Sequence, residues 1–202
     1  MKKVFFGNSG AEANECAIKV ARKYSAMKKG DDCYTIVTLW NSFHGRTLTT
    51  LAATGQDVFH KDFQPLTPGF VHAEANNLAD VKRLAEENAC CAVMLEVVQG
   101  EGGVLPLDYE YVQALKKFCE ERNWLLLTDE VQTGVGRTGK LFACQQYDIL
   151  PDVCSFAKGI AGGMPMSGIM ANEKCRAVLT PGTHATTFGG NPVCAAAGLV
   201  VQ

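Results

Sequence analysis

Residues 124–139 read WLLLTDEVQTGVGRTG, and the beginning of this stretch is the clearest strand signal in the chain. The run Trp124–Thr128 is almost wholly apolar and does not alternate with polar residues. This pattern is typical of a parallel strand that is covered by helices on both faces. The run ends in Asp129, which we therefore expect to be buried. A buried carboxylate is costly unless donors or a cation meet it, so polar partners are expected at this strand end.

Similar apolar runs recur along the chain and are separated by segments with helical periodicity. The other expected strands are Val4–Phe6, Tyr34–Trp40, Ala92–Val97, Val153–Phe156 and Ser167–Ala171, and the expected helices are Glu12–Lys28, Asn77–Glu87 and Asp108–Arg122. This alternation predicts an α/β fold with a mainly parallel sheet flanked by helices. In such sheets ligands bind beyond the carboxyl ends of the strands.

The composition is that of an ordinary globular domain. The chain has 202 residues, of which 47% are hydrophobic and 20% charged, with a formal net charge of −2. This balance argues against a nucleic-acid partner or an acidic membrane surface. The nine cysteines show no CxxC pair and no zinc-type spacing, which favours a reducing compartment. Without a signal peptide or a membrane-length apolar run, a cytoplasmic location is expected.

The stretch CSFAKGIAGG at residues 154–163 places a lysine between an expected strand and a glycine-rich loop. In the commoner interpretation, Lys158 is the first solvated residue after the strand. In the other, Lys158 is an amine nucleophile that forms a Schiff base with a carbonyl, which requires partial desolvation. The glycines would then let a ligand approach the backbone closely. This stretch alone does not decide between the two.

The turn GNSGAEANE at residues 7–15 leads from the first expected strand into a helix. Free backbone N–H groups at a helix N-terminus suit a phosphate, and Gly10 and Ala11 would be the donors. The alternative is an ordinary turn that is capped by Ser9 or Asn8.

The stretch NSFHGRT at residues 41–47 follows the second expected strand. Phe43 could stack on a planar ring, and Arg46 could bind a carboxylate with two parallel hydrogen bonds. Alternatively, Phe43 packs in the core and Arg46 is solvated. Further on, Glu96 and Glu101 bracket a glycine-rich loop and are candidates for an acid/base pair or for partners of a cation. Nothing in the pattern assigns a metal to them.

Three of these features are what one cofactor requires. A buried Asp can hold the protonated nitrogen of a pyridine ring, a desolvated Lys can hold an aldehyde on that ring, and a helix N-terminus can hold its phosphate. Together Asp129, Lys158 and the turn at Gly10 therefore predict pyridoxal 5'-phosphate as cofactor.

The chain also resembles a known family. The segments NSGAEANE, NSFHGRT, VVQGEGGV, TDEVQTGVGRTG, SFAKGIAGGMP and HATTFGGNP occur in this order. They resemble the class III pyridoxal-phosphate-dependent aminotransferases over essentially the whole chain, and most closely the members that act on N-acetylornithine. The most specific match is TDEVQTGVGRTG followed by SFAKG. The resemblance implies the large domain of a fold type I transferase.

The resemblance also implies roles for single residues. Lys158 would be the Schiff-base lysine, and Asp129 the partner of the pyridinium nitrogen. The other implied cofactor-binding residues are Gly10, Ala11, Phe43, Glu130, Val131 and Gln132, with Phe43 stacked on the ring and Gln132 facing its hydroxyl group.

Further residues are implied for the substrate and for a second subunit. Arg46 would bind the substrate α-carboxylate, and Glu101 matches an acidic residue that pairs with a switching arginine. Thr187 would contact the phosphate across the interface of a homodimer, with Thr186 as its neighbour on the substrate side.

The sequence departs from the family pattern in two places and in length. Val97 stands where the family usually has proline, and GMPMSGIMA at residues 163–171 differs from the usual Pro-Ile-Gly sequence. We expect residues 1–202 to form the cofactor-binding large domain, with the N-terminal segment and the C-terminal small domain of the family absent.

The implied reaction is transamination of N-acetylornithine, or ornithine, with 2-oxoglutarate as amino acceptor, a step of arginine biosynthesis. The alternatives are an aminotransferase for another ω-amine such as 4-aminobutyrate, an aminomutase, and an isolated cofactor-binding domain without activity. A nucleotide-binding domain is disfavoured because GxGxxG and P-loop patterns are missing.

Overall fold

Seven strands form one sheet in the computed structural model, which describes residues 1–202. In sheet order they are β1 (Lys3–Gly7), β9 (Ser167–Ala171), β8 (Val153–Phe156), β7 (Leu125–Asp129), β4 (Cys90–Leu95), β2 (Thr35–Leu39) and β3 (Phe70–Ala73). All neighbours pair in parallel except β9, which runs antiparallel to β1 and β8. The predicted α/β fold with a mainly parallel sheet is confirmed.

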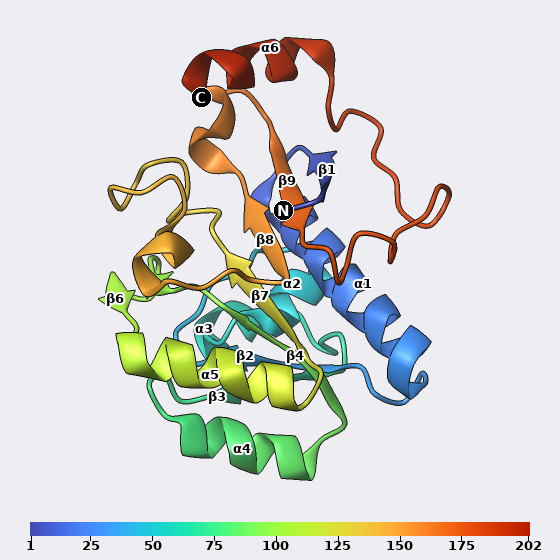
Figure 1. The fold of residues 1–202 in the computed structure, drawn as a ribbon, viewed down its shortest axis with the longest axis vertical. Helices are drawn as coiled ribbons and strands as arrows, with labels where there is room; N and C mark the ends of the chain where they lie inside the picture. Colours follow the sequence, from blue (N-terminus) through green and yellow to red (C-terminus); the bar gives the residue numbers. More distant parts are fainter.

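Helices cover both faces of this sheet. The six α-helices of the chain are α1 (Gly10–Lys29), α2 (Leu48–Ala53), α3 (Asp57–His60), α4 (Leu78–Glu87), α5 (Tyr109–Glu121) and α6 (Pro192–Val201). Of these, α6 packs against residues 158–161 rather than on a face of the sheet. Two 3-10 helices, η1 (Ala143–Tyr147) and η2 (Lys158–Ala161), and a small pair of strands, β5 (Val98–Gln99) and β6 (Leu105–Pro106), complete the structure. Figure 1 shows α4 and α5 side by side, while α1 crosses the opposite side of the sheet.

The central strands face a separate apolar core on each side. In β4, Val93 and Leu95 belong to the core that contains α4 and α5, whereas Ala92 and Met94 belong to the core that contains α1. All six residues of β4 are buried. Burial on both faces explains why these strands show no polar alternation in the sequence.

Strand β3 and the short helices α2 and α3 were not predicted. Strand β3 reads FVHA, has four residues and lies at the edge of the sheet, where three of them are only half-buried. Helices α2 and α3 have six and four residues, which is too short for a helical period to show. Their formation depends on packing rather than on local pattern.

All nine cysteines are free, and all but Cys33 are buried. Burial raises the pKa of the Cys90 and Cys91 thiols to about 12, which makes them poor nucleophiles at neutral pH. None of the helices combines the length and the apolar character that spanning a membrane would require.

We predict that Leu126→Ala lowers the free energy of unfolding by about 2–5 kcal/mol, because it leaves a cavity in the packed core of β7. Leu126 is 1% exposed. Leu150→Ala is the matched control, since that side chain is 58% exposed and should change stability by less than about 0.5 kcal/mol. Urea unfolding of both variants measures the difference, and equal values would contradict the assignment of this core.

Candidate active site

A cavity of about 560 Å³ lies beyond the carboxyl ends of the central strands. This volume falls within the range of small-molecule sites. Residues from five separate segments line it, among them Gly10, Phe43, Arg46, Asp129 and Lys158. The structure thus brings together candidates that lie up to about 150 positions apart in the sequence, as the parallel topology requires.

Helix α1 opens at the edge of the cavity with two free donors. Ser9 is the N-cap, and its side chain accepts from the Glu12 amide, while the Glu12 carboxylate accepts from the amides of Asn8 (2.8 Å) and Ser9 (2.7 Å). The amides of Gly10 and Ala11 have no partner within the chain. Because the capping box occupies the flanking donors, these two amides remain available at the positive end of a 20-residue helix.

Asp129 ends β7 and is only 3% exposed. Its Oδ2 accepts from Asn14 Nδ2 (2.7 Å) and His44 Nδ1 (2.8 Å), and its Oδ1 accepts from the Val131 amide (3.0 Å) and Ser155 Oγ (3.4 Å). No lysine or arginine pairs with this carboxylate. Asp129 is therefore satisfied by donors but still lines the cavity as an anion, which suits a cation that arrives with a ligand.

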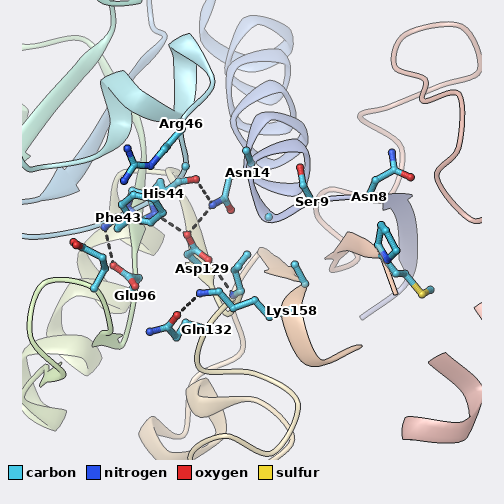
Figure 2. A pocket seen from close by; sticks show the side chains of 18 of the residues that line it. Asn8, Ser9, Asn14, Phe43, His44, Arg46, Glu96, Asp129, Gln132 and Lys158 are labelled. Carbon is cyan, nitrogen blue, oxygen red and sulfur yellow. Dashed lines mark hydrogen bonds and ion pairs between the residues drawn. The ribbon is translucent and has the colours of Figure 1, made fainter. Parts of the chain in front are cut away.

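Asn14 and His44 are site residues that the sequence analysis did not select. Both are 1% exposed, and Figure 2 shows them converging on Asp129 from α1 and from the loop after β2. Asn14 also donates to the backbone oxygen of His44 (2.8 Å), and this bond fixes α1 to the loop that follows β2. Since a carboxylate can only accept, His44 must donate from Nδ1. One sequence signal was present, because Asn14 is one of only two polar residues, with Ser25, among the buried residues of α1.

Lys158 is the first residue of η2, separated from β8 only by Ala157, and its backbone φ is 46°. The left-handed conformation costs a residue other than glycine about 1 kcal/mol or more, and such strain collects at functional sites. The amine extends into the cavity and donates to Gln132 Oε1 (Figure 2). The Lys158 side chain is exposed to the cavity rather than buried, which differs from the partial desolvation expected from the sequence.

Two glycines make room for the residues beside Asp129. A Cβ on Gly100 would lie 2.4 Å from Gln132 Nε2, and a Cβ on Gly10 would lie 2.7 Å from Val131 Cγ1. Only glycine at position 100 therefore leaves space for the Gln132 amide, and only glycine at position 10 leaves space for the Val131 side chain. Both side chains line the cavity.

Glu96 is 4% exposed and joins two loops of the site. It accepts from the amides of Phe43 (3.0 Å) and Gly100 (3.2 Å). Burial raises its pKa to about 7, and the negative charge of Asp129 adds to this rise, while His44 and the two amides oppose it. Through its hydrogen bond with the Phe43 amide, Glu96 thus fixes the backbone of Phe43, the residue expected to stack on the ring (Figure 2).

Arg46 and Glu101 line the cavity but do not pair with each other. Arg46 is exposed and has no hydrogen-bond or ion-pair partner within the chain. Glu101 accepts from Gln56 Nε2 at 2.5 Å. The cavity therefore offers one free guanidinium group to a carboxylate.

The structure corrects the expectation for Glu130. Its side chain is fully buried and does not line the cavity. Its carboxylate accepts from the amides of Ala143 (3.0 Å) and Cys144 (2.7 Å) and from Thr133 Oγ1. Glu130 thus binds the start of η1, and alternation along the extended backbone places it opposite to its cavity-facing neighbours.

Thr186 and Thr187 do not reach this cavity. Thr187 is exposed, and Thr186 Oγ1 accepts from Asn8 Nδ2 at 3.2 Å. Both residues line a different hollow beside Glu12 and Glu15.

We predict that the free energy of unfolding decreases as the pH rises from 4.5 to about 7, because of Glu96. In this window the folded protein keeps a proton that the unfolded chain has already lost, so folding is favoured at the acidic end. Glu96→Gln should flatten the decrease, whereas Glu121→Gln, at a side chain 61% exposed, should leave it unchanged. Urea unfolding at several pH values measures the slopes, and a wild-type slope in Glu96→Gln would contradict the prediction.

Comparison with proteins of known sequence identifies the family. A model of the aminotransferase class-III family matches residues 1–201. The chain is 55% identical over 202 residues to an acetylornithine aminotransferase of Haemophilus ducreyi, covering 100% of this chain and 51% of that protein. It is 49% identical to a succinylornithine transaminase of Citrobacter koseri, covering 96% and 48%. The chain therefore spans about half the length of the curated relatives that it matches.

Comparison with solved structures also points to aminotransferases. The ornithine aminotransferase of Toxoplasma gondii superposes with a TM-score of 0.93 at 34% identity, covering 98% of this chain and 48% of that one. An amine transaminase from an uncultivated Pseudomonas species, determined with bound pyridoxal phosphate as the internal aldimine, gives 0.91 at 26% identity, covering 98% and 51%. The family predicted from the sequence motifs is thus confirmed, and the chain belongs to the class III aminotransferases.

Proposed function

We propose that the protein is a pyridoxal-phosphate-dependent transaminase that moves an amino group from N-acetylornithine, or ornithine, to 2-oxoglutarate, as in arginine biosynthesis. The observation that carries this proposal is the convergence of Lys158 and Asp129 in one cavity beside a free helix N-terminus. Relatives named for acetylornithine and succinylornithine favour an acylated ornithine as the amine. A cytoplasmic location is part of the same proposal.

The residues of the cavity fit this cofactor. The unpartnered amides of Gly10 and Ala11 would hold its phosphate. The Asp129 carboxylate, which accepts from Asn14 and has no lysine or arginine partner, would hold the protonated ring nitrogen. Phe43 and Val131, which both line the cavity, would contact the ring.

Pyridoxal phosphate, when bound, supplies an electron sink for negative charge on the substrate carbon that bears the amino group. The Lys158 amine would remove a proton from that carbon as a general base and, as a general acid, would give it to the cofactor carbon joined to the amino nitrogen. Gln132, which accepts from Lys158 Nζ, keeps the amine within the cavity. Arg46 would bind a substrate carboxylate with its unpaired guanidinium group.

A homodimer would complete the site. Thr187 is exposed and lies outside the cavity of its own chain, which leaves it accessible to a phosphate bound by a second copy. Residues 1–202 would then form the cofactor-binding domain of each subunit.

Lys158→Ala should abolish turnover and also the visible absorbance band of lysine-bound cofactor, because no other amine lines the cavity. The measurement is an absorbance spectrum with added pyridoxal phosphate beside an assay with N-acetylornithine. Lys117→Ala is the control, since its side chain is 78% exposed on α5. Turnover at the wild-type rate in Lys158→Ala would refute the proposal.

Asp129→Asn should reduce kcat by at least about 100-fold while the lysine-bound absorbance band remains. The amide keeps the size of the side chain but loses the negative charge that would hold the ring proton. Steady-state kinetics and the spectrum of the same preparation separate loss of chemistry from loss of cofactor. An unchanged kcat would remove Asp129 from the mechanism.

A further inference from the structure

The Arg46 guanidinium group is held by aromatic rings rather than by a carboxylate. Its central carbon lies 4.6 Å from the centroid of the Phe59 ring and 5.7 Å from that of the Phe43 ring. The two rings meet edge to face, with centroids 5.7 Å apart and planes at 79°. Phe59 lies closer to the cation than Phe43 but does not line the cavity itself.

The Phe59 ring is itself fixed, because α3 is anchored at both ends. At its end, His60 is buried, and its Nε2 lies 2.9 Å from the oxygen of Leu51 in α2 and 2.7 Å from the oxygen of Thr54, which follows α2. At its start, Gln56 Nε2 donates to the Ser42 oxygen (3.1 Å) as well as to Glu101. These hydrogen bonds at both ends of the four-residue helix α3 restrict the position of the Phe59 ring.

A ring holds a guanidinium group differently from a carboxylate. A carboxylate partner would neutralise Arg46 and compete with the carboxylate of a substrate for the same N–H groups. A ring attracts the cation electrostatically and leaves the N–H donors at the edge of the guanidinium plane unoccupied. It also limits the positions that the long Arg46 side chain samples before a ligand binds, which is preorganisation.

We infer that Phe59 is a positioning residue that sets the preference for carboxylate-bearing amines by holding Arg46 over its ring. This inference rests on the proposed function, because Arg46 is taken to bind the substrate carboxylate. Figure 2 shows Arg46 on the same side of the cavity as Phe43, opposite Asn8 and Ser9. A carboxylate bound there lies away from the free helix N-terminus, which remains available to a phosphate.

The test compares two amines in the full protein: N-acetylornithine and N-acetylputrescine, which is the same molecule without its carboxylate. Phe59→Leu should raise KM for N-acetylornithine about three- to tenfold and leave its kcat unchanged. KM for N-acetylputrescine should not change. Phe59→Tyr should behave as the wild type, because it keeps the ring face. Phe63→Leu is the matched control, because Phe63 follows α3 directly along the chain, is 58% exposed and has no cation over its ring.

A second variant separates the electrostatic role from packing. Replacing Phe59 with pentafluorophenylalanine keeps the shape of the ring but reverses the charge distribution of its face, so KM for N-acetylornithine should again rise. This variant decides the question if Phe59→Leu does not fold. A wild-type KM in the fluorinated variant, or an equal loss of kcat with both amines, would overturn the inference.

Binding without turnover distinguishes the two proposals. Glutarate carries carboxylates but no amino or keto group, and its dissociation constant can be measured by calorimetry. If the wild type transfers an amino group from neither amine, the proposed function fails, and glutarate still tests Phe59. Weaker glutarate binding in Phe59→Leu than in Phe63→Leu supports the positioning role, and equal binding refutes it.

Discussion

The burial of the Asp129 carboxylate is the constraint on which the site depends. An anion at the end of a buried strand is tolerated only if donors surround it, and here they come from three other segments. Asn14 belongs to α1, His44 to the loop after β2, and Ser155 to β8. The hydrogen bonds of Asp129 thus hold the N-terminal part of α1, the loop that carries Phe43 and the strand that precedes Lys158 in fixed positions relative to one another.

The charges around the cavity are kept apart rather than paired. Asp129 has no lysine or arginine partner, Arg46 rests on aromatic rings, and the Lys158 amine meets a neutral amide. Pairing them would stabilise the chain but would leave nothing for a charged ligand. The raised pKa of Glu96 shows the cost, because burial, and then the negative charge of Asp129, make this carboxyl group resist ionisation. A site of this kind lacks ion pairs that would stabilise the fold, and its charged groups therefore remain available to bind a ligand.

Much of the fold and part of the site could be predicted from the sequence. The central strands were evident because burial on both faces removes polar alternation, and Lys158 and Asp129 stood out because charged residues rarely end such runs. Strand β3 at the sheet edge gave no such signal. Glu130 was misassigned because its neighbours on either side face the cavity, and a sequence does not reveal on which face of the chain one residue points. Phe59 was missed because its partner is a cation 13 positions away.

The sequence by itself determined the α/β class, the family and the residues able to perform chemistry, because these depend on local pattern and on motifs contiguous in the chain. Only the tertiary structure decided which of these residues meet. Asn14 lies 115 positions from Asp129, and His44 lies 85 positions from it, yet both donate to the same oxygen. Contacts of this kind follow from strand order and helix placement. They arise when the whole apolar core packs, and no short stretch of sequence encodes that event.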